Sequence, residues 1–148
     1  MRYSTEVTIH LPREKVVELF DNHDNLYKWQ AGLKSHSVIE GTPGKVGCRS
    51  ELVYEGRKGD LVMTETVILN DLPEAFHVEY RTKGVYNEMQ SRFEEAGPER
   101  TVWHAGNLFR FRGLMALMAP FLKNAFRSNT ILNMERFKTF AENEFHSN

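Results

Sequence analysis

Glu65 is the carboxylate whose position would let it perform acid–base chemistry. It has the same strand parity as Met63, Val67 and Leu69. If that face points inward, burial raises the pKa of the carboxyl group and suits it to general acid or base catalysis. The opposite face of the strand is equally able to point inward, with Val62, Thr64, Thr66 and Ile68. The pattern fits both phases, with the balance toward an exposed Glu65, which is therefore a weak catalytic candidate.

Five other polar side chains are candidates for hydrogen bonds to a ligand. Ser91 and Asn107 lie on the apolar faces of two adjacent expected strands. There they either bond a ligand carbonyl or hydroxyl group or, as is the norm, satisfy backbone groups and water in the core. Asn129, Thr130 and Asn133 interrupt the apolar run of the last expected helix. They mark either a polar end of a cavity or a helix flank that faces solvent.

Aromatic side chains supply the apolar surface of the expected site, namely Trp29, Tyr54, Tyr80, Trp103 and Phe126. The two tyrosines combine an apolar ring with a hydroxyl group that can anchor a ligand, and Trp29 is able to wall an entrance. Packing in an ordinary core also accounts for these rings, and it is the more common role.

Metal, nucleophile and phosphate sites are not indicated. No pair of histidines has the i, i+4 spacing of a helical zinc site. Four of the six histidines fall at strand positions that we expect to face solvent, namely His10, His36, His77 and His104. Cys48 is an isolated thiol, no serine lies in a nucleophile-elbow motif, and the glycines from Gly41 to Gly47 do not form a phosphate loop. We expect no metal and no cofactor.

The elements that must position these residues are readable in order along the chain. Residues 3–9 alternate between apolar and polar side chains, which predicts a strand with one covered face. Pro12 begins an amphipathic helix. Asp24 or Asn25 is expected to cap a second short helix, which ends at Gly32.

The rest of the chain predicts a sheet and a long helix. Between Leu33 and Phe111, six strands are separated by short turns, which favour hairpins and hence a strongly curved antiparallel sheet. Pro120 then begins a helix to about Phe145, with an inner stripe of Leu122, Phe126, Thr130, Met134, Phe137 and Ala141. Residues 1–148 are predicted to form one α+β domain.

Composition excludes some partners. The 148 residues include 19 Lys and Arg against 20 Asp and Glu, so nucleic acid is not expected as a partner. The first residues lack the apolar run of a signal peptide, no stretch approaches the length of a spanning segment, and the single cysteine fits a reducing compartment. We therefore expect a cytoplasmic protein without stable membrane insertion. No feature identifies a protein partner. A basic cluster surrounds the start of the last helix and either meets an anionic head group or is a solvated edge: Arg110, Arg112, Lys123 and Arg127.

The order of several short motifs resembles the START-like, SRPBCC superfamily. They are the runs Val7 to Val16 and Asn25 to Gly32, then Gly44-Lys45-Val46-Gly47, Leu72-Pro73 and Arg136-Phe137-Lys138 to Glu142. The resemblance covers essentially the whole chain and implies a helix-grip fold, in which a curved seven-stranded antiparallel sheet wraps around the long C-terminal helix. Two short helices follow the first strand. No catalytic set of the superfamily matches residue by residue, so the resemblance supplies no catalytic residue.

Three functions are consistent with these features. A helix laid across a curved sheet cannot fill all the space beneath it, so we expect an apolar cavity of roughly 300–1,000 Å³. It would bind or transport a hydrophobic or amphipathic small molecule such as a lipid or polyketide. The first alternative is a polyketide cyclase or dehydratase with Glu65 as acid or base and Tyr54 or Tyr80 as donor. The second is a protein-interaction module resembling the heat-shock ATPase activators.

Overall fold

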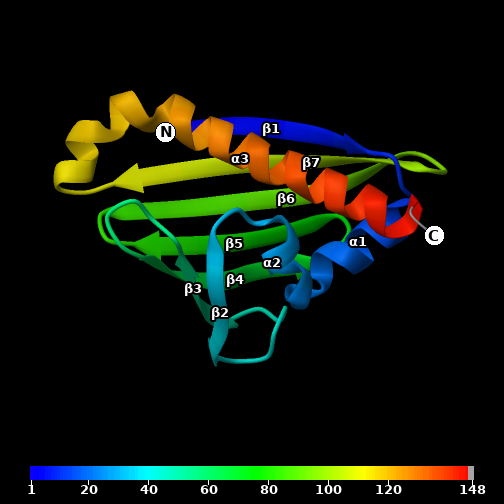
Figure 1. Ribbon diagram of the computed structural model, residues 1–148, viewed down its shortest axis with the longest axis horizontal. Coiled ribbons are helices and arrows are strands. Elements are labelled where there is room, and N and C mark those ends of the chain that lie inside the picture. The colour runs from blue at the N-terminus through cyan, green and yellow to red at the C-terminus, as the bar shows by residue number, and fades with distance from the viewer. Residues whose placement is uncertain (147–148) are drawn as a thin grey trace.

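The computed structural model describes residues 1–146 and contains one antiparallel sheet, a long C-terminal helix and two short α-helices (Figure 1). In chain order the elements are β1 (Arg2–Ile9), α1 (Arg13–Asp21), the 3₁₀ helix η1 (His23–Asn25), α2 (Leu26–Trp29), β2 (Leu33–Glu40), β3 (Arg49–Tyr54), β4 (Leu61–Asp71), β5 (Ala75–Thr82), β6 (Val85–Gly97), β7 (Arg100–Phe111) and α3 (Leu114–His146). The seven strands pair in the order β1-β7-β6-β5-β4-β3-β2. The predicted helix-grip fold and its six strands after α2 are confirmed.

The alternation in β1 is the pattern that the sequence predicts. Tyr3, Thr5, Val7 and Ile9 are buried, and the residues between them are more exposed. Since β1 pairs with β7 at one edge of the sheet, one strand face is covered and the other is wet. The covered face is the concave side of the sheet, on which α3 lies.

Asn25, one of the two residues expected, takes the N-cap position of α2 but makes no side-chain cap hydrogen bond. The side-chain cap belongs to Asn22 at the start of η1, whose side-chain oxygen accepts a hydrogen bond from the backbone N–H of Asp24 at 3.1 Å. Asn25 already lies inside the helical segment, and its buried amide donates to the Leu19 carbonyl at 3.1 Å. Asn22 precedes the first turn, so its oxygen faces the N–H groups that have no helical partner.

The long helix begins earlier than predicted. It starts at Leu114, so Pro120 lies inside the helix instead of at its first turn. The prediction gave the proline too much weight, because residues 114–119 are leucine, methionine and alanine, which are strong helix formers. The predicted inner stripe is correct, since Met134, Phe137 and Ala141 are buried and the earlier members are half-buried.

Aromatic rings form the core where α1, α2 and the second half of α3 meet the sheet. The Phe137 ring lies 5.2 Å from the Trp29 ring and 5.4 Å from the Trp103 ring, measured between centroids. Phe20 from α1 adds a ring 4.9 Å from Phe93 on β6. This cluster closes one end of the concave side.

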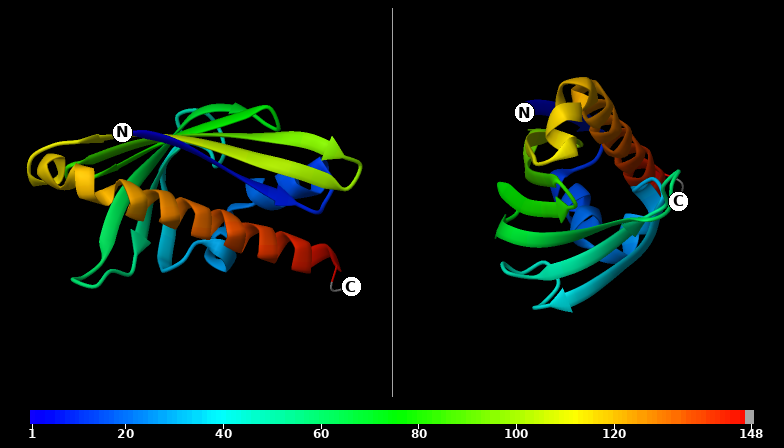
Figure 2. Two further views of the ribbon diagram at one scale, coloured as in Figure 1. Left: turned by 90° about the horizontal axis from the view of Figure 1, so that it is seen from above. Right: turned by 90° about the vertical axis from the view of Figure 1, so that its left-hand side faces the viewer.

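The other end of the concave side is less covered. Helix α3 packs mainly on β1, α2 and β7, and Figure 2 shows it beside β1 while the sheet curls away toward β2. Inward-facing residues of β4 to β6 accordingly keep part of their surface accessible, among them Met63, Tyr80, Asn87 and Met89. In the described part of the chain, no helix is long and apolar enough to cross a membrane.

Candidate ligand-binding site

A continuous row of polar side chains crosses the concave face over four neighbouring strands. Ser50 on β3 pairs with Glu65 on β4, Glu65 pairs with Tyr80 on β5, and Tyr80 pairs with Asn87 on β6. Directly opposed residues of antiparallel strands point to the same face. We call Ser50, Glu65, Tyr80 and Asn87 the polar row.

Apolar side chains flank the polar row. On the side nearer the aromatic core, the next inward-facing position of each of the four strands is apolar. These positions hold Cys48, Val67, Val78 and Met89. On the other side, Leu52 pairs with Met63 on the same inner face. Ser50 is buried, whereas Glu65, Tyr80 and Asn87 are half-buried. Apolar walls with a few polar groups between them are features that small-molecule sites generally share.

Glu65 faces inward, contrary to the balance of the sequence pattern. Its neighbours across the strands, Ser50 and Tyr80, are on the concave face, while Val62 and Ile68 are 47% and 38% exposed on the convex face. The pattern misled because these exposed β-branched residues look like core residues. Leu69 loses its inner position because the register shifts between Val67 and Leu69.

Burial governs the electrostatics of the polar row. It raises the pKa of Glu65, against the smaller lowering effects of the Tyr80 hydrogen bond and of the charge that His23 carries when protonated. It also raises the pKa of Tyr80 well above its ordinary value, and the nearby Glu65 and Tyr54 raise it further. The pKa of Tyr54 is raised mainly by burial and, to a smaller extent, by the charge of Glu65. The tyrosines are therefore hydrogen-bond donors at neutral pH, and Glu65 is suited to proton transfer.

Helix α2 and its flanks complete this end of the site. The Tyr54 hydroxyl donates to the side-chain carbonyl of Gln30. His36 pairs with Leu52 and so faces inward, which corrects the expectation that it faces solvent. Its ring centroid lies 5.6 Å from that of His23. The pKa of His36 is lowered mainly by burial and, to a smaller extent, by the electrostatic effect of His23. The expectation failed because β2 shifts register twice, which breaks simple parity counting.

Asn107 is joined to the polar row and has an unused donor. Its side chain is buried, and its Oδ1 accepts a hydrogen bond from Asn87 Nδ2 at 3.1 Å. Its own Nδ2 has no hydrogen-bond partner among the described residues. A buried polar atom without a partner is uncommon and calls for an explanation. Asn87 itself was missed by sequence reasoning, although it shares parity with Met89 and Ser91.

The remaining predicted site residues lie outside the polar row. The Trp103 indole N–H donates to Ser91 Oγ at 3.1 Å, and both side chains are buried. Trp29 is also buried in the aromatic core. These three positions therefore have evident packing roles in the free protein.

Three predicted residues on α3 have mixed surroundings. The Phe126 ring is half-buried and stacks on Phe109 at 4.9 Å. Thr130 shares a 2.8 Å hydrogen bond with the Tyr3 hydroxyl. Asn133 Oδ1 accepts from the backbone N–H of Ala31 at 3.3 Å. Thr130 and Asn133 thus hold α3 to β1 and to the end of α2, while the Phe126 ring borders the less covered end.

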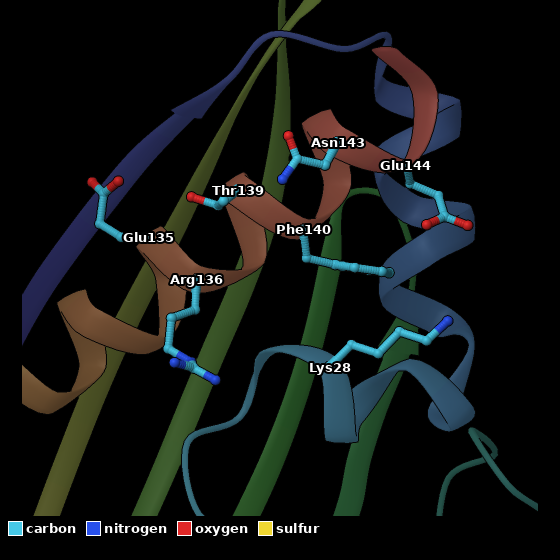
Figure 3. Close-up of a pocket in the computed structure, with 7 residues that line it drawn as sticks. All are labelled: Lys28, Glu135, Arg136, Thr139, Phe140, Asn143 and Glu144. Atoms are coloured by element: carbon cyan, nitrogen blue, oxygen red, sulfur yellow. The ribbon is translucent and has the colours of Figure 1, made fainter. Parts of the chain in front are cut away.

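A separate open pocket lies on the outer surface between α2 and α3 (Figure 3). It is lined by Lys28, Glu135, Arg136, Thr139, Phe140, Asn143 and Glu144. Arg136 donates to the Trp29 carbonyl at 2.9 Å, and the Lys28 ammonium lies 5.5 Å from the Phe140 ring centroid. These contacts join the two helices. The pocket does not reach the polar row.

Comparison with known proteins places the chain in a family. The model of the polyketide cyclase / dehydrase and lipid transport family matches residues 1–142, which is nearly the whole sequence. The chain belongs to this family. No curated protein matches it.

Solved structures share the fold of this member of the polyketide cyclase / dehydrase and lipid transport family. The Zhui aromatase/cyclase from Streptomyces sp. R1128 superimposes with a TM-score of 0.81, at 13% identity over 97% of this chain and 94% of its own. TTHA0849 from Thermus thermophilus has a TM-score of 0.80, at 14% identity over 98% and 99%. Ara h 8.0201 has a TM-score of 0.72, at 11% identity over 95% and 97%. At these identities the likeness concerns the fold alone.

Proposed function

We propose that the protein binds a hydrophobic or amphipathic small molecule on the concave face, between the polar row and α3. The observation that carries this proposal is the polar row itself, because its half-buried members lie between apolar neighbours. A ring system or acyl chain gains by covering the apolar neighbours. The polar row then orients a ligand that has at least one carbonyl or hydroxyl group.

Membership of the family supports the same ligand class. The description of the family joins polyketide cyclases and dehydrases with lipid transport, and the substrates of both kinds are largely apolar with a few oxygen atoms. The unpaired Asn107 Nδ2 fits this class too: it is enclosed in the free protein, and a ligand oxygen near Asn87 would accept a hydrogen bond from it once the amide turns toward the concave face. Among the class, lipids and polyketide-like aromatic rings are the proposed ligands.

The test compares two probes that differ by one hydroxyl group, naphthalene and a naphthol. Tyr80→Phe removes the hydroxyl group from the polar row and keeps the ring. We expect Tyr80→Phe to weaken naphthol binding by about tenfold, the value of one hydrogen bond, and to leave naphthalene binding unchanged. Equilibrium titration measured by intrinsic fluorescence gives both affinities.

The matched control is Tyr86→Phe, which removes a hydroxyl group from the convex face, where Tyr86 contacts Glu79 and Glu88. It should bind both probes like the wild type. The proposal is wrong if neither probe binds saturably, or if Tyr86→Phe and Tyr80→Phe weaken naphthol binding equally.

A second function, elimination of water from a β-hydroxy ketone, is favoured by the inward position of Glu65. The Glu65 carboxylate would take a proton from the carbon beside the ketone, and the electrons of that C–H bond would form a C=C bond. The C–O bond of the β-hydroxyl group breaks, and the leaving hydroxide takes the proton from Glu65. Water departs and the carboxylate is restored. Tyr80, on the neighbouring strand, would donate a hydrogen bond to the ketone oxygen.

A β-hydroxytetralone tests this reaction, because loss of water converts it to a naphthol that is detected by its absorbance. We expect Glu65→Gln to lower the rate at least about a hundredfold, as for loss of an acid–base group, while naphthol binding is retained. Glu51→Gln is the control, since Glu51 is exposed on the convex face of β3. A wild-type rate no faster than buffer, or full activity of Glu65→Gln, removes the enzymatic function and leaves the binding function standing.

A further inference from the structure

The first half of α3 has an apolar face that the sheet does not cover. Leu114, Leu117 and Phe121 are 74%, 73% and 80% exposed, and Met118 beside them is 44% exposed. These positions recur at i, i+3, i+4 and i+7, so they form one stripe along the helix. The adjacent stripe, about 100° around the helix, contains Met115, Leu122 and Phe126 and is half-buried. This segment is therefore apolar on two faces.

The second half of the same helix differs. Apart from Leu132, its exposed positions are mainly polar, among them Glu135, Arg136, Thr139 and Glu144, as expected of a helix that faces water. The change within one helix shows that the exposed apolar stripe is local. We call Leu114, Leu117, Met118 and Phe121 the helix tip.

The helix tip lies in a segment of one charge sign. The sequence has no aspartate or glutamate between Glu99 and Glu135, although the chain as a whole has a net charge of -1. The same segment contains Arg110, Arg112, Lys123 and Arg127. The Arg110 guanidinium lies against the Tyr86 ring, at 5.8 Å from its centroid. Arg112, just before the helix tip, is exposed, and so are Lys123 and Arg127 on the other side of α3.

Two turns of the sheet lie at the same end of the molecule as the helix tip. The Arg112 backbone N–H donates to the Gly84 carbonyl at 2.9 Å, which brings the β5–β6 turn with Lys83 beside the start of α3. The β3–β4 turn reaches the same end (Figure 1) and adds Arg57 and Lys58. Its two acidic residues are Glu55 and Asp60, and Asp60 is paired with Lys34 at 3.0 Å. This rim is thus mainly basic.

We propose that the helix tip docks on an anionic lipid surface. Exposed leucine and phenylalanine side chains enter the boundary between head groups and acyl chains, and the arginine and lysine side chains at the same end of the molecule meet the negative head groups. A second copy of this chain would bring the same basic residues together, so charge complementarity favours the anionic surface. The less covered end of the concave face lies beside the helix tip, so docking would bring the proposed ligand site next to the bilayer.

The test measures co-sedimentation of the full chain with vesicles of phosphatidylcholine, with or without phosphatidylserine. We expect binding that requires phosphatidylserine and falls as salt rises, because salt screens the basic residues. Leu117→Ser/Phe121→Ser should weaken binding by at least about tenfold. Lys83→Gln/Arg112→Gln should also weaken it, with a smaller salt dependence than the wild type.

Controls separate the helix tip from general surface effects. Leu132→Ser removes an apolar side chain that is 51% exposed farther along α3. Lys45→Gln/Arg92→Gln removes two exposed charges elsewhere. Both should bind vesicles like the wild type. The helix-tip variants should still bind the naphthol probe, so that failure of docking and failure of the proposed ligand site remain distinguishable.

Three outcomes would overturn the proposal. In the first, the helix-tip variants bind vesicles as tightly as the wild type does. In the second, binding does not depend on phosphatidylserine. In the third, the wild type does not bind vesicles and forms a dimer in sedimentation. In the last case, loss of the dimer in Leu117→Ser/Phe121→Ser would assign the helix tip to a contact between two copies of the chain.

Discussion

At the scale of single residues, the unpaired side-chain amide of Asn107 should lower the free energy of unfolding of the ligand-free protein. Its buried Nδ2 has no partner among the described residues, and an unpaired buried donor costs about 1–3 kcal/mol. In Asn107→Leu, Asn87 keeps its 3.2 Å hydrogen bond to the Leu108 carbonyl. We therefore expect Asn107→Leu to leave the free energy of unfolding unchanged or to raise it by about 1 kcal/mol, while naphthol binding weakens. Urea denaturation measures the first effect and fluorescence titration the second.

The control is Asn129→Leu, at an exposed position on α3, which should not weaken naphthol binding. A large loss of stability in Asn107→Leu would mean that Asn107 is needed for the fold. Its unpaired donor would then be no evidence for a ligand.

Glu65 should make stability depend on pH in a defined direction. Burial raises its pKa in the folded state, so the folded protein holds the proton more tightly than the unfolded chain does. Ionising Glu65 is then less favourable in the folded state than in the unfolded chain. The stability of the wild type therefore falls relative to that of Glu65→Gln as the pH rises from about 4.3, the ordinary glutamate pKa, through the raised pKa of the folded state. Below about pH 4 the two proteins should be equally stable.

Thermal unfolding of the two proteins between acidic and neutral pH measures this difference. Glu18→Gln, on the exposed side of α1, is the matched control. If the stability difference between Glu65→Gln and the wild type is flat across the range, Glu65 is as well hydrated as a surface carboxylate. Its proposed role in proton transfer would then lose its basis.

At the scale of elements, α3 is held mainly by its second half. Phe137 is fully buried among aromatic rings, whereas Phe126 is half-buried and stacks on Phe109 and Phe111. We expect Phe137→Ala to lower the free energy of unfolding by about 3–5 kcal/mol. The cost of Phe126→Ala should be smaller, about 1–2 kcal/mol. Urea denaturation measures both, and a larger loss for Phe126→Ala would contradict the assignment of the anchor.

The sequence predicts most elements correctly, for reasons visible in particular residues. The strands follow from alternation such as that in β1 and from short turns that contain glycine, asparagine or proline. The start of α3 was missed because Pro120 is a strong local signal, and the helix-forming residues before it were given less weight. A proline can lie inside a helix when the neighbouring residues favour the helical conformation. The proline alone therefore does not show where the helix begins.

The polar row was only partly predictable. Tyr80 and Glu65 were candidates, yet the exposed Val62 and Ile68 made the outer face of β4 look like the buried one. The register shift that turns Leu69 outward after Val67 leaves no sign in the sequence pattern. Asn87 had the right parity and was overlooked. The unpaired Asn107 Nδ2 depends on the placement of single atoms, which no sequence pattern contains.

At the scale of the whole molecule, the concave face and the helix tip have separate roles in this account. The polar row lies among apolar side chains, where a small molecule is proposed to bind. The helix tip lies at one end of α3, where a lipid surface is proposed to dock. The net charge of the whole chain is only -1, so it does not reveal the basic segment near the helix tip. That segment is basic because no acidic residue lies between Glu99 and Glu135.

The six methionines report on these regions separately. Met63 and Met89 are on the concave face beside the polar row, Met115 and Met118 are at the start of α3, Met134 is in the core, and Met1 is at the N-terminus. NMR spectra of methyl-labelled methionine, recorded during titration with the naphthol, test the central claim most directly. We predict saturable shifts at Met63 and Met89 with little change at Met118. Shifts confined to Met115 and Met118, or no saturable shift, would contradict binding on the concave face.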